Sequence, residues 1–349
     1  VDTLQIKLGM REQQLVRRRW TENTEAYDEY LRGIKTLVIV PTHENIHKMR
    51  QHFERAVELD PGFGRGYALL AVTWVYYGNF QLEPAEKAYA EVRRLAHKAI
   101  ELEGELYEAY WALGWADLAG EYAWKAAEDN FRRAIDLAPG EWGGYHSLGY
   151  VLGAVGRIEE AHEAARIAIE VDPLGFLPRH GQKVLYTRQR NYEASIEVVE
   201  EQAGVHGWGP DLQTNAAWLS ARAGNEAEAR VILAELEALN SSIPYVQLAM
   251  AGSYAILGEE DKALAIAEQW ESFAQETHRY NIAGALGLIF AELGDADRAM
   301  HWLTRSREAH SMWMLFLDYE EFDFLRDDPR FVALVRELKL PEDVYLSKK

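Results

Sequence analysis

The strongest candidate for catalytic chemistry in this sequence is the run His43-Glu44-Asn45-Ile46-His47. Two histidines four residues apart on a helix can bind zinc while the glutamate between them acts as a base. The extended form of this motif has a third histidine ten residues after the first, and that position holds Phe53. Thr42 also suits the N-cap of a helix, and Glu44 suits its first turn. We therefore predict an ordinary helix start without a metal, and keep a zinc metallohydrolase acting through His43, Glu44 and His47 as an alternative.

Two pairs of neighbouring acids, Glu320-Glu321 and Asp327-Asp328, are of the type that performs acid–base catalysis. Neighbouring residues on a helix point in different directions, and both pairs lie near expected helix ends, so we predict that they cap helices. The glycine-rich run 62–66 lacks the lysine and hydroxyl residue of a phosphate-binding loop, which predicts a turn. Because the chain has no cysteine, disulfides, thiolate catalysis and zinc–thiolate sites are excluded. The sequence thus predicts no catalytic residue and no cofactor.

The charge balance argues against nucleic acid as a partner. The 349 residues include 37 Lys and Arg against 56 Asp and Glu, a formal net charge of −19. An acidic surface repels phosphate groups. The basic cluster Arg17-Arg18-Arg19 is a local exception, and we predict that it forms a solvated face.

No segment of the sequence predicts membrane insertion or a secretory signal. The apolar stretch 37–40 ends at Pro41 and is too short to span a bilayer. The chain begins with Val1 rather than Met and opens within a pattern, so we expect it to be a piece of a longer protein. The absence of cysteine suits the cytoplasm, which is the compartment we predict, and also allows the periplasm if a transmembrane helix lies upstream.

A phrase that recurs about every 34 residues must position any site in this chain. Its clearest copy sets small and large residues in a fixed order: Tyr145, Leu148, Gly149, Gly156, Ala161, Ala165, Ala168, Asp172 and Pro173. Ala127 lies 34 residues before Ala161, and Pro139 lies 34 residues before Pro173. This period and layout are typical of tetratricopeptide repeats, in which each copy is a helical hairpin that buries its apolar side by stacking on its neighbours.

The repeats predict an all-α fold, an α-α superhelix of about eight helical hairpins. We assign the array to residues 24–310, with a lead-in at 1–23, a bend at 204–210 and capping helices at 311–349. Within a hairpin, small residues such as Gly149 and Ala161 let the two helices approach closely.

The first helices of such hairpins line a concave groove, which is the usual place for a partner segment. Counting by repeat offset, six residues are predicted on this face: Trp111, Trp115, His146, Tyr150, Trp218 and Arg222. Aromatic and arginine side chains are typical binding anchors, although the tryptophans could instead pack between neighbouring helices. Because these positions are mostly aromatic and the chain is acidic, an apolar or basic segment suits the groove better than an acidic one.

Three segments carry a more specific resemblance. They are residues 17–33 (RRRWTENTEAYDEYLRG), residues 53–63 (FERAVELDPGF), and residues 325–331 (LRDDPRF) followed by Leu340-Pro341. They resemble the tetratricopeptide array found C-terminal in many bacterial class III adenylate cyclases, and in some membrane-bound transcription regulators with a winged-helix head. The resemblance covers residues 17–345 and implies a sensory or regulatory module. The metal-binding carboxylates and nucleotide pocket of such cyclases belong to a separate α/β domain, so no catalytic residue is carried over to this chain.

We therefore predict a non-catalytic protein–protein interaction array that forms the regulatory C-terminal region of a signalling protein such as an adenylate cyclase. Its partner is expected to be a protein or peptide, or a second copy of the chain. A homodimer would suit such cyclases, which need two catalytic domains together, and Trp313-Met314-Leu315-Phe316 offers an apolar cluster for it. The alternative is a free-standing scaffold, which the upstream sequence of the gene would distinguish.

Overall fold

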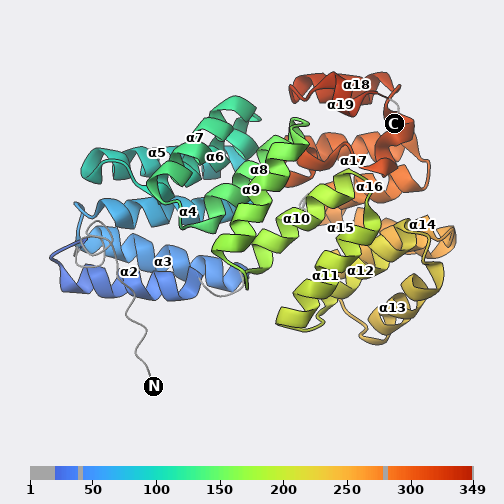
Figure 1. The fold of residues 1–349 in the computed structure, drawn as a ribbon, viewed down its shortest axis with the longest axis horizontal. Helices are drawn as coiled ribbons and strands as arrows, with labels where there is room; N and C mark the ends of the chain where they lie inside the picture. Colours follow the sequence, from blue (N-terminus) through green and yellow to red (C-terminus); the bar gives the residue numbers. More distant parts are fainter. Residues whose placement is uncertain (1–19, 38–41, 278–281, 348–349) are drawn as a thin grey trace.

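Sixteen consecutive helices pair into eight antiparallel hairpins that follow one another as a solenoid (Figure 1). The computed structural model describes residues 20–37, 42–277 and 282–347, and no β-strand occurs in these ranges. The predicted all-α superhelix of about eight hairpins is confirmed. The hairpins are α2 (Thr24–Leu37) with α3 (His43–Leu59), α4 (Gly64–Asn79) with α5 (Ala85–Glu103), α6 (Tyr107–Glu121) with α7 (Trp124–Leu137), α8 (Trp142–Ala154) with α9 (Ile158–Val171), α10 (Phe176–Arg188) with α11 (Tyr192–His206), α12 (Pro210–Arg222) with α13 (Glu226–Ala238), α14 (Pro244–Ile256) with α15 (Glu260–Thr277), and α16 (Ala283–Glu292) with α17 (Ala296–Glu308).

The turns inside several hairpins share one backbone geometry. Gly156, Gly224, Gly258 and Gly294 each follow a first helix with φ between 73° and 81°, a region that glycine enters without steric cost. The amide of the next residue then donates to a carbonyl five residues earlier at 2.8–2.9 Å, which closes the helix end. The fifth hairpin, whose sequence drifts from the phrase, has Arg190 in the same conformation at φ 58°. The hairpins therefore share the geometry of this turn even where the residue at the turn is not glycine.

Glycines also set how closely the two helices of a hairpin approach. A Cβ added to Gly114 would lie 2.5 Å from a ring carbon of Phe131, so this ring packs against bare backbone. A Cβ added to Gly149 would lie 3.6 Å from the carbonyl oxygen of Ala161, which is an ordinary contact. The close approach predicted at Gly149 and Ala161 is confirmed, and the tightest fit occurs where the facing side chain is aromatic.

The first helices of the hairpins form the inner face of the solenoid. They pack directly on one another from α4 to α10 and again from α12 to α16. Within the described ranges, α10 and α12 are not packed closely in this way, and residues 207–209 join α11 to α12 at this step. Two small clusters of buried apolar residues lie around α10–α13 and α12–α15, while the large cluster has members on both sides of this step. The bend at 204–210 stays a prediction.

After the last hairpin the chain turns back across the inner face. It forms two short 3-10 helices, η1 (Met312–Phe316) and η2 (Glu320–Leu325), and then α18 (Pro329–Glu337) and α19 (Glu342–Tyr345). We call residues 310–346 the C-terminal segment. Its η1 contacts α8, α16 and α17, its η2 contacts α16, and its α18 packs on α17.

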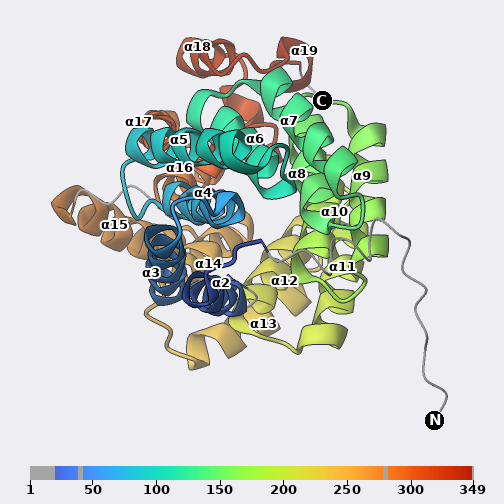
Figure 2. The ribbon, with the colours of Figure 1, turned by 90° about the vertical axis from the view of Figure 1, so that its left-hand side faces the viewer.

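The end of the C-terminal segment also binds the third and fourth hairpins, as the view along the solenoid shows (Figure 2). The indole N–H of Trp124 donates to the carbonyl of Leu338 at 2.7 Å, and the hydroxyl of Tyr345 donates to the carbonyl of Ala154 at 3.0 Å. Both hydrogen bonds are buried. Beyond the capping role predicted for residues 311–349, this segment therefore ties the end of the solenoid to its middle.

Some predictions fall on residues outside the described ranges. These are the basic cluster Arg17-Arg18-Arg19, most of the lead-in 1–23, and residues 38–41 of the short apolar stretch and its proline. Of the helices that the structure describes, none combines the length and the apolar character needed to cross a bilayer.

Candidate binding site on the inner face

Part of the inner face is filled by residues 315–323 (LFLDYEEFD) of the C-terminal segment. Asp318 forms an ion pair with Arg188 of α10 at 2.6 Å, and their side chains are only 3% and 1% exposed. The same guanidinium donates to the carbonyl of Leu315 and lies 5.4 Å from the ring centroid of Phe316. Two charges removed from water are stable together only with such additional partners. Arg188 therefore anchors the C-terminal segment to the inner face.

Two further contacts extend this docking towards α11. Arg190, in the turn after α10, pairs with Asp323 at 2.6 Å, with both side chains about one-third exposed. The hydroxyl of Tyr192, at the start of α11, donates to a carboxylate oxygen of Glu320. The acidic residues of the C-terminal segment thus meet a row of donors from the fifth hairpin.

The capping prediction holds for one acid pair and is wrong for the other. Asp328 is the N-cap of α18, because its carboxylate accepts from the amide of Arg330 at 2.8 Å. Glu321 caps nothing: it is buried, and its carboxylate lies 2.9 Å from a guanidinium nitrogen of Arg222, which also pairs with Glu292. Burial raises the pKa of Glu321, and the charge of Arg222 opposes that shift. The role of Glu321 is therefore set by its ion pair with Arg222 of another hairpin and not by its position near a helix end.

Beside the docked stretch, the inner face keeps an open cavity of about 380 Å³, which we call the inner-face pocket. The first helices α10, α12, α14 and α16 form most of its wall, and the C-terminal segment supplies the rest. Its volume lies within the range of small-molecule sites, about 300–1,000 Å³. The lining is mainly aliphatic with five aromatic side chains: Trp218, Tyr245, Trp313, Phe316 and Tyr319.

Lys183 of α10 brings a cationic group into this apolar pocket. The residue is 8% exposed, and its ammonium donates to the amide oxygen of Asn215 on α12 at 2.5 Å. No carboxylate in the described ranges forms an ion pair with it, and burial lowers the pKa of Lys183 to about 8. A buried titratable group with a perturbed pKa in a cavity is a recognised mark of a functional site.

His180 lies one turn before Lys183 and also lines the pocket. Burial, together with the charges of Lys183 and His146, keeps the pKa of His180 well below its ordinary value, so its imidazole is neutral near pH 7. The hydroxyl of Thr187 donates to the carbonyl of Lys183 at 3.0 Å and is thereby occupied. The polar groups that face the pocket are therefore few and differ in kind, which suits orientation of one bound group.

Of the six predicted groove residues, Trp218 lies on the wall of the inner-face pocket. Its ring centroid is 6.2 Å from that of Tyr319 in the C-terminal segment and 6.2 Å from that of Tyr192. Arg222, one turn further along α12, lies over Trp218 at 5.7 Å and is held by the carboxylate of Glu321. These two residues therefore meet the protein's own C-terminal segment.

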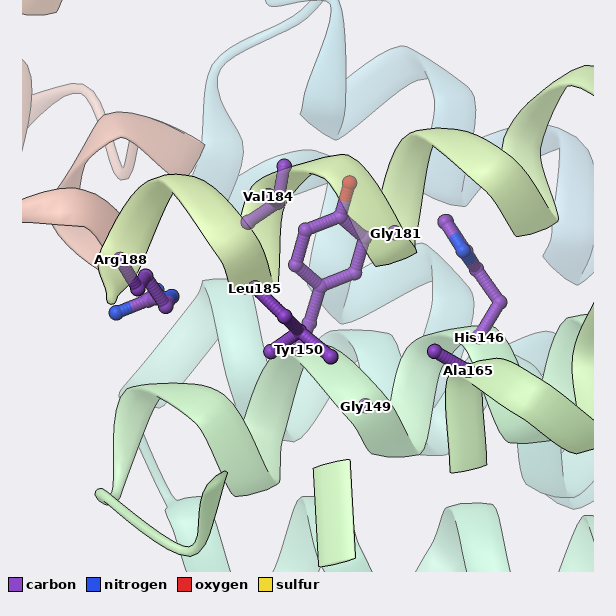
Figure 3. A pocket seen from close by; sticks show the side chains of 8 residues that line it. All are labelled: His146, Gly149, Tyr150, Ala165, Gly181, Val184, Leu185 and Arg188. Atoms are coloured by element: carbon purple, nitrogen blue, oxygen red, sulfur yellow. The ribbon is translucent and has the colours of Figure 1, made fainter. Parts of the chain in front are cut away.

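His146 and Tyr150 lie on α8 beside a second cavity, which is narrow and has a volume of about 10 Å³. Figure 3 shows both rings rising from α8 towards α10, where Gly181 comes close enough that a Cβ would lie 3.0 Å from His146 Nδ1. This nitrogen has no hydrogen-bond partner among the described residues, and burial lowers the pKa of His146 to about 4. The cavity is about the size of one water molecule, so the rings serve here as packing.

Trp111 and Trp115 of α6 also pack inside the solenoid. The indole N–H of Trp111 donates to Ser147 Oγ at 3.0 Å and to the carbonyl of Gly143 at 3.2 Å, both on α8. Trp115 is 4% exposed and meets the Phe131 ring edge-on at 5.9 Å. This is the packing that the sequence left open as the alternative for tryptophans. Partner binding by the six predicted residues stays a prediction.

The histidine motif lies at the start of α3. Thr42 is its N-cap, since the Thr42 hydroxyl accepts an amide of the first turn at 3.2 Å, which confirms the predicted helix start. Glu44 pairs with Lys48 at 2.6 Å, and a ring nitrogen of His47 bonds to the hydroxyl of Tyr77. Among the described residues, no three His, Asp or Glu side chains converge as they would around a metal.

Several solved structures resemble this solenoid in fold. The human IFIT1 dimer with m7Gppp-AAAA matches with a TM-score of 0.59 and 14% identity, over 81% of this chain and 71% of that one. Yeast Tom70 matches with a TM-score of 0.52 and 18% identity, over 92% and 69%. PilW, a type IV pilus biogenesis factor, matches with a TM-score of 0.51 and 12% identity, over 64% and 96%.

The fold is that of a tetratricopeptide-repeat solenoid. At these identities the likeness concerns the fold and carries no ligand or partner over to this chain. No protein-family model matches the sequence, and no curated protein matches it. The function of this solenoid must therefore be argued from its own residues.

Sequence reasoning missed the polar residues of the inner-face pocket. The repeat offset that gives His146 gives His180 34 residues later, but the drift of the fifth hairpin from the phrase concealed it. The sequence pointed only weakly to Lys183 as a pocket residue, because a lysine one turn after an inner-face position is normally expected to be a surface charge. Asn215 carried none, since only the structure brings α12 beside Lys183.

Proposed function

We propose that this solenoid is a non-catalytic interaction array that forms the regulatory C-terminal region of a signalling protein such as an adenylate cyclase. The resemblance of residues 17–345 to the arrays of such cyclases supports this assignment. The fold supports it as well, because a tetratricopeptide solenoid presents extended surfaces on a rigid frame. The predicted cytoplasmic compartment belongs to the same proposal.

The observation that carries the proposal is an exposed apolar edge where α10 begins and α11 ends. Four large apolar side chains are exposed there: Leu174, Leu177, Val205 and Trp208. The ring of Phe176 lies 5.7 Å from that of His206, so the start of α10 and the end of α11 are neighbours. We call these four residues the α10–α11 edge. Exposed apolar side chains that gather on one surface mark interaction sites.

Trp208 is the proposed anchor of this edge. It is 55% exposed and also borders an outer groove between α11 and α13, which includes Ile196 and Ile232. A large aromatic side chain beside an apolar groove is typical of a residue that contributes much of the binding energy. The partner is a protein of the same signalling assembly or a second copy of the chain, and a basic rim on it would complement the net charge of −19.

Sedimentation velocity from low to high micromolar concentration tests self-association, and titration against the domain encoded upstream tests binding to the parent protein. We expect one of the two, and we expect Leu177→Ser with Trp208→Ser to weaken it about tenfold or more, equivalent to ~1.4 kcal/mol. Leu102→Ser on α5, also at an exposed apolar residue, is the matched control and should leave binding unchanged. The proposal would be overturned if the chain stays monomeric and does not bind the domain of its parent protein.

The free-standing scaffold is distinguished by the gene itself. A cyclase or another signalling domain encoded upstream of Val1 supports the regulatory assignment. If the coding sequence starts close to Val1, the cyclase assignment fails, while an interaction through the α10–α11 edge remains open to the same binding experiments.

A further inference from the structure

We propose that the inner-face pocket binds a small apolar monocarboxylic acid, with its carboxylate on Lys183 and Asn215 and its apolar body against Trp218. This inference goes beyond the proposed function, because it concerns a small molecule and a surface separate from the α10–α11 edge.

The first step of the argument is the charge of Lys183. In the described part of the chain, two other cationic residues are at least as deeply buried, Arg188 and Arg326, and each has a carboxylate partner, Asp318 and Asp323 respectively. Lys183 has only a neutral amide oxygen among the described residues. A buried charge without a counter-charge is costly, and an anion in the pocket would remove that cost. The pocket is therefore complementary to one negative group.

The neighbours of Lys183 define which anion fits. The amide nitrogen of Asn215 donates one hydrogen to the carbonyl of Asp211 at 2.6 Å and keeps its second hydrogen for a planar oxygen group beside the ammonium. The neutral imidazole of His180 can offer a further N–H to the same group. Among the residues that the structure describes, no second cation lines the pocket. A dianion would place its second charge against apolar wall, so a monocarboxylate fits better than a phosphate monoester or a dicarboxylate.

The rest of the pocket wall favours a ligand whose body, apart from the carboxylate, is apolar. Trp218, Leu248 and Leu288 come from three different first helices and face the same space. Gly252 of α14 keeps this space open, since a Cβ there would meet nothing nearer than Trp218 at 3.7 Å and Leu288 at 3.9 Å. Burial of apolar ligand surface against such a wall is favourable, because it removes that surface from water.

The position of the C-terminal segment favours a small molecule over a peptide as the ligand of the pocket. An extended peptide would need to run along the inner face, but residues 315–323 occupy its continuation past α10 and α8. Tyr319 and Trp313 of that segment close the pocket on this side. The space that remains is a cavity of about 380 Å³ and not a groove that continues along the inner face.

The experiment is isothermal titration of the whole chain with phenylpropionate, indoleacetate and octanoate, each beside its neutral amide. We expect at least one acid to bind, with at least a tenfold preference over its amide. Lys183→Met should abolish that preference, whereas Lys125→Met, at an exposed residue of α7, should leave it intact. The proposal is overturned if no acid binds, if acids and amides bind equally, or if Lys183→Met changes nothing.

A second variant protects the test against misfolding. Gly252→Leu keeps every charge and fills the pocket, so it should block the acids while the chain retains its helical circular dichroism and melting temperature. A short peptide that ends in phenylalanine with a free carboxylate is titrated in parallel, and binding of this peptide without any small acid would also overturn the proposal. The Leu177→Ser and Trp208→Ser variant should bind the acid normally, which separates this result from the fate of the α10–α11 edge.

Discussion

The inner face differs between the third and fourth hairpins and the four hairpins that follow. At α6 and α8 it is closed: Trp111 and Trp115 pack within the solenoid, and His146 and Tyr150 pack towards α10 beside a cavity of only about 10 Å³. From α10 to α16 the same face keeps a pocket of about 380 Å³. Both regions are built from the same repeat phrase, so the phrase alone does not decide whether the face is open.

Two local features make the difference. First helices pack directly from α4 to α10 and from α12 to α16, and the exception is the step from α10 to α12, both of which line the pocket. Phe316 of the C-terminal segment borders both regions: its ring is 6.2 Å from that of Tyr150 on the closed side and lines the pocket on the other. The C-terminal segment therefore seals one region and shapes the other.

The largest expected effect comes from detaching that segment. Asp318→Ala leaves the guanidinium of Arg188 buried without its counter-charge, and we expect a loss of ~3–5 kcal/mol in the free energy of unfolding. Urea denaturation followed by tryptophan fluorescence measures it. The matched control is Arg190→Met, which breaks the partly exposed pair with Asp323 but leaves Asp323 paired with the buried Arg326, and it should cost under about 1 kcal/mol.

A double variant separates the charge from the docking. Arg188→Met with Asp318→Leu removes both charges and keeps an apolar contact, so it should recover much of the lost stability. If Asp318→Ala costs no more than Arg190→Met, the C-terminal segment does not hold the inner face as the structure indicates.

The fold was predictable because its determinants are local and periodic. Gly149, Ala161 and Gly156 lie within one hairpin, so their spacing in the sequence fixes both the helix contact and the turn. The path of the C-terminal segment was not predictable in this way, because Arg188 and Asp318 are 130 residues apart and no repeat links them. Glu321 shows the same limit, since its partner Arg222 lies in another hairpin.

The candidate site was predicted only in part for the same reason. Counting offsets placed Trp218 on the inner face, where it lines the pocket. The same count gave Trp111, which hydrogen-bonds to α8, and Trp115, which packs on Phe131 of α7. Whether a first-helix residue is open or covered depends on the distance to the next hairpin, and the phrase does not encode that distance.

A second expected effect concerns acid, and it tests the closed region. Burial lowers the pKa of His146 to about 4, against 6.5 as the ordinary value, so the unfolded chain binds a proton first as the pH falls. The stability that neutral His146 contributes is present above about pH 6.5 and is lost between there and pH 4, with a loss of about 2 kcal/mol by pH 5. Denaturation at several pH values measures it.

His146→Phe is the control for that prediction. The ring keeps the edge-on contact with Tyr150, at 4.8 Å between centroids, but does not titrate. The difference in unfolding free energy between the wild type and this variant should therefore shift in favour of the variant as the pH falls through this range. His180, on the open side, shifts in the same direction and remains in both proteins, so the part of its pKa shift that burial and Lys183 cause cancels. A difference that stays constant with pH would show that His146 is not buried neutral.

The smallest effect compares a glycine of each region. Alanine at Gly114, on the closed side, meets the Phe131 ring at 2.5 Å, and overpacking of this kind costs ~1–3 kcal/mol, which a helix-propensity gain of about 1 kcal/mol offsets only in part. Alanine at Gly252, on the open side, meets nothing closer than 3.7 Å, so the propensity gain should appear as stabilisation of up to about 1 kcal/mol. Thermal and urea unfolding of the two variants should thus give opposite signs. Equal losses would mean that both glycines are required by packing, and that the inner-face pocket is smaller in solution than the structure shows.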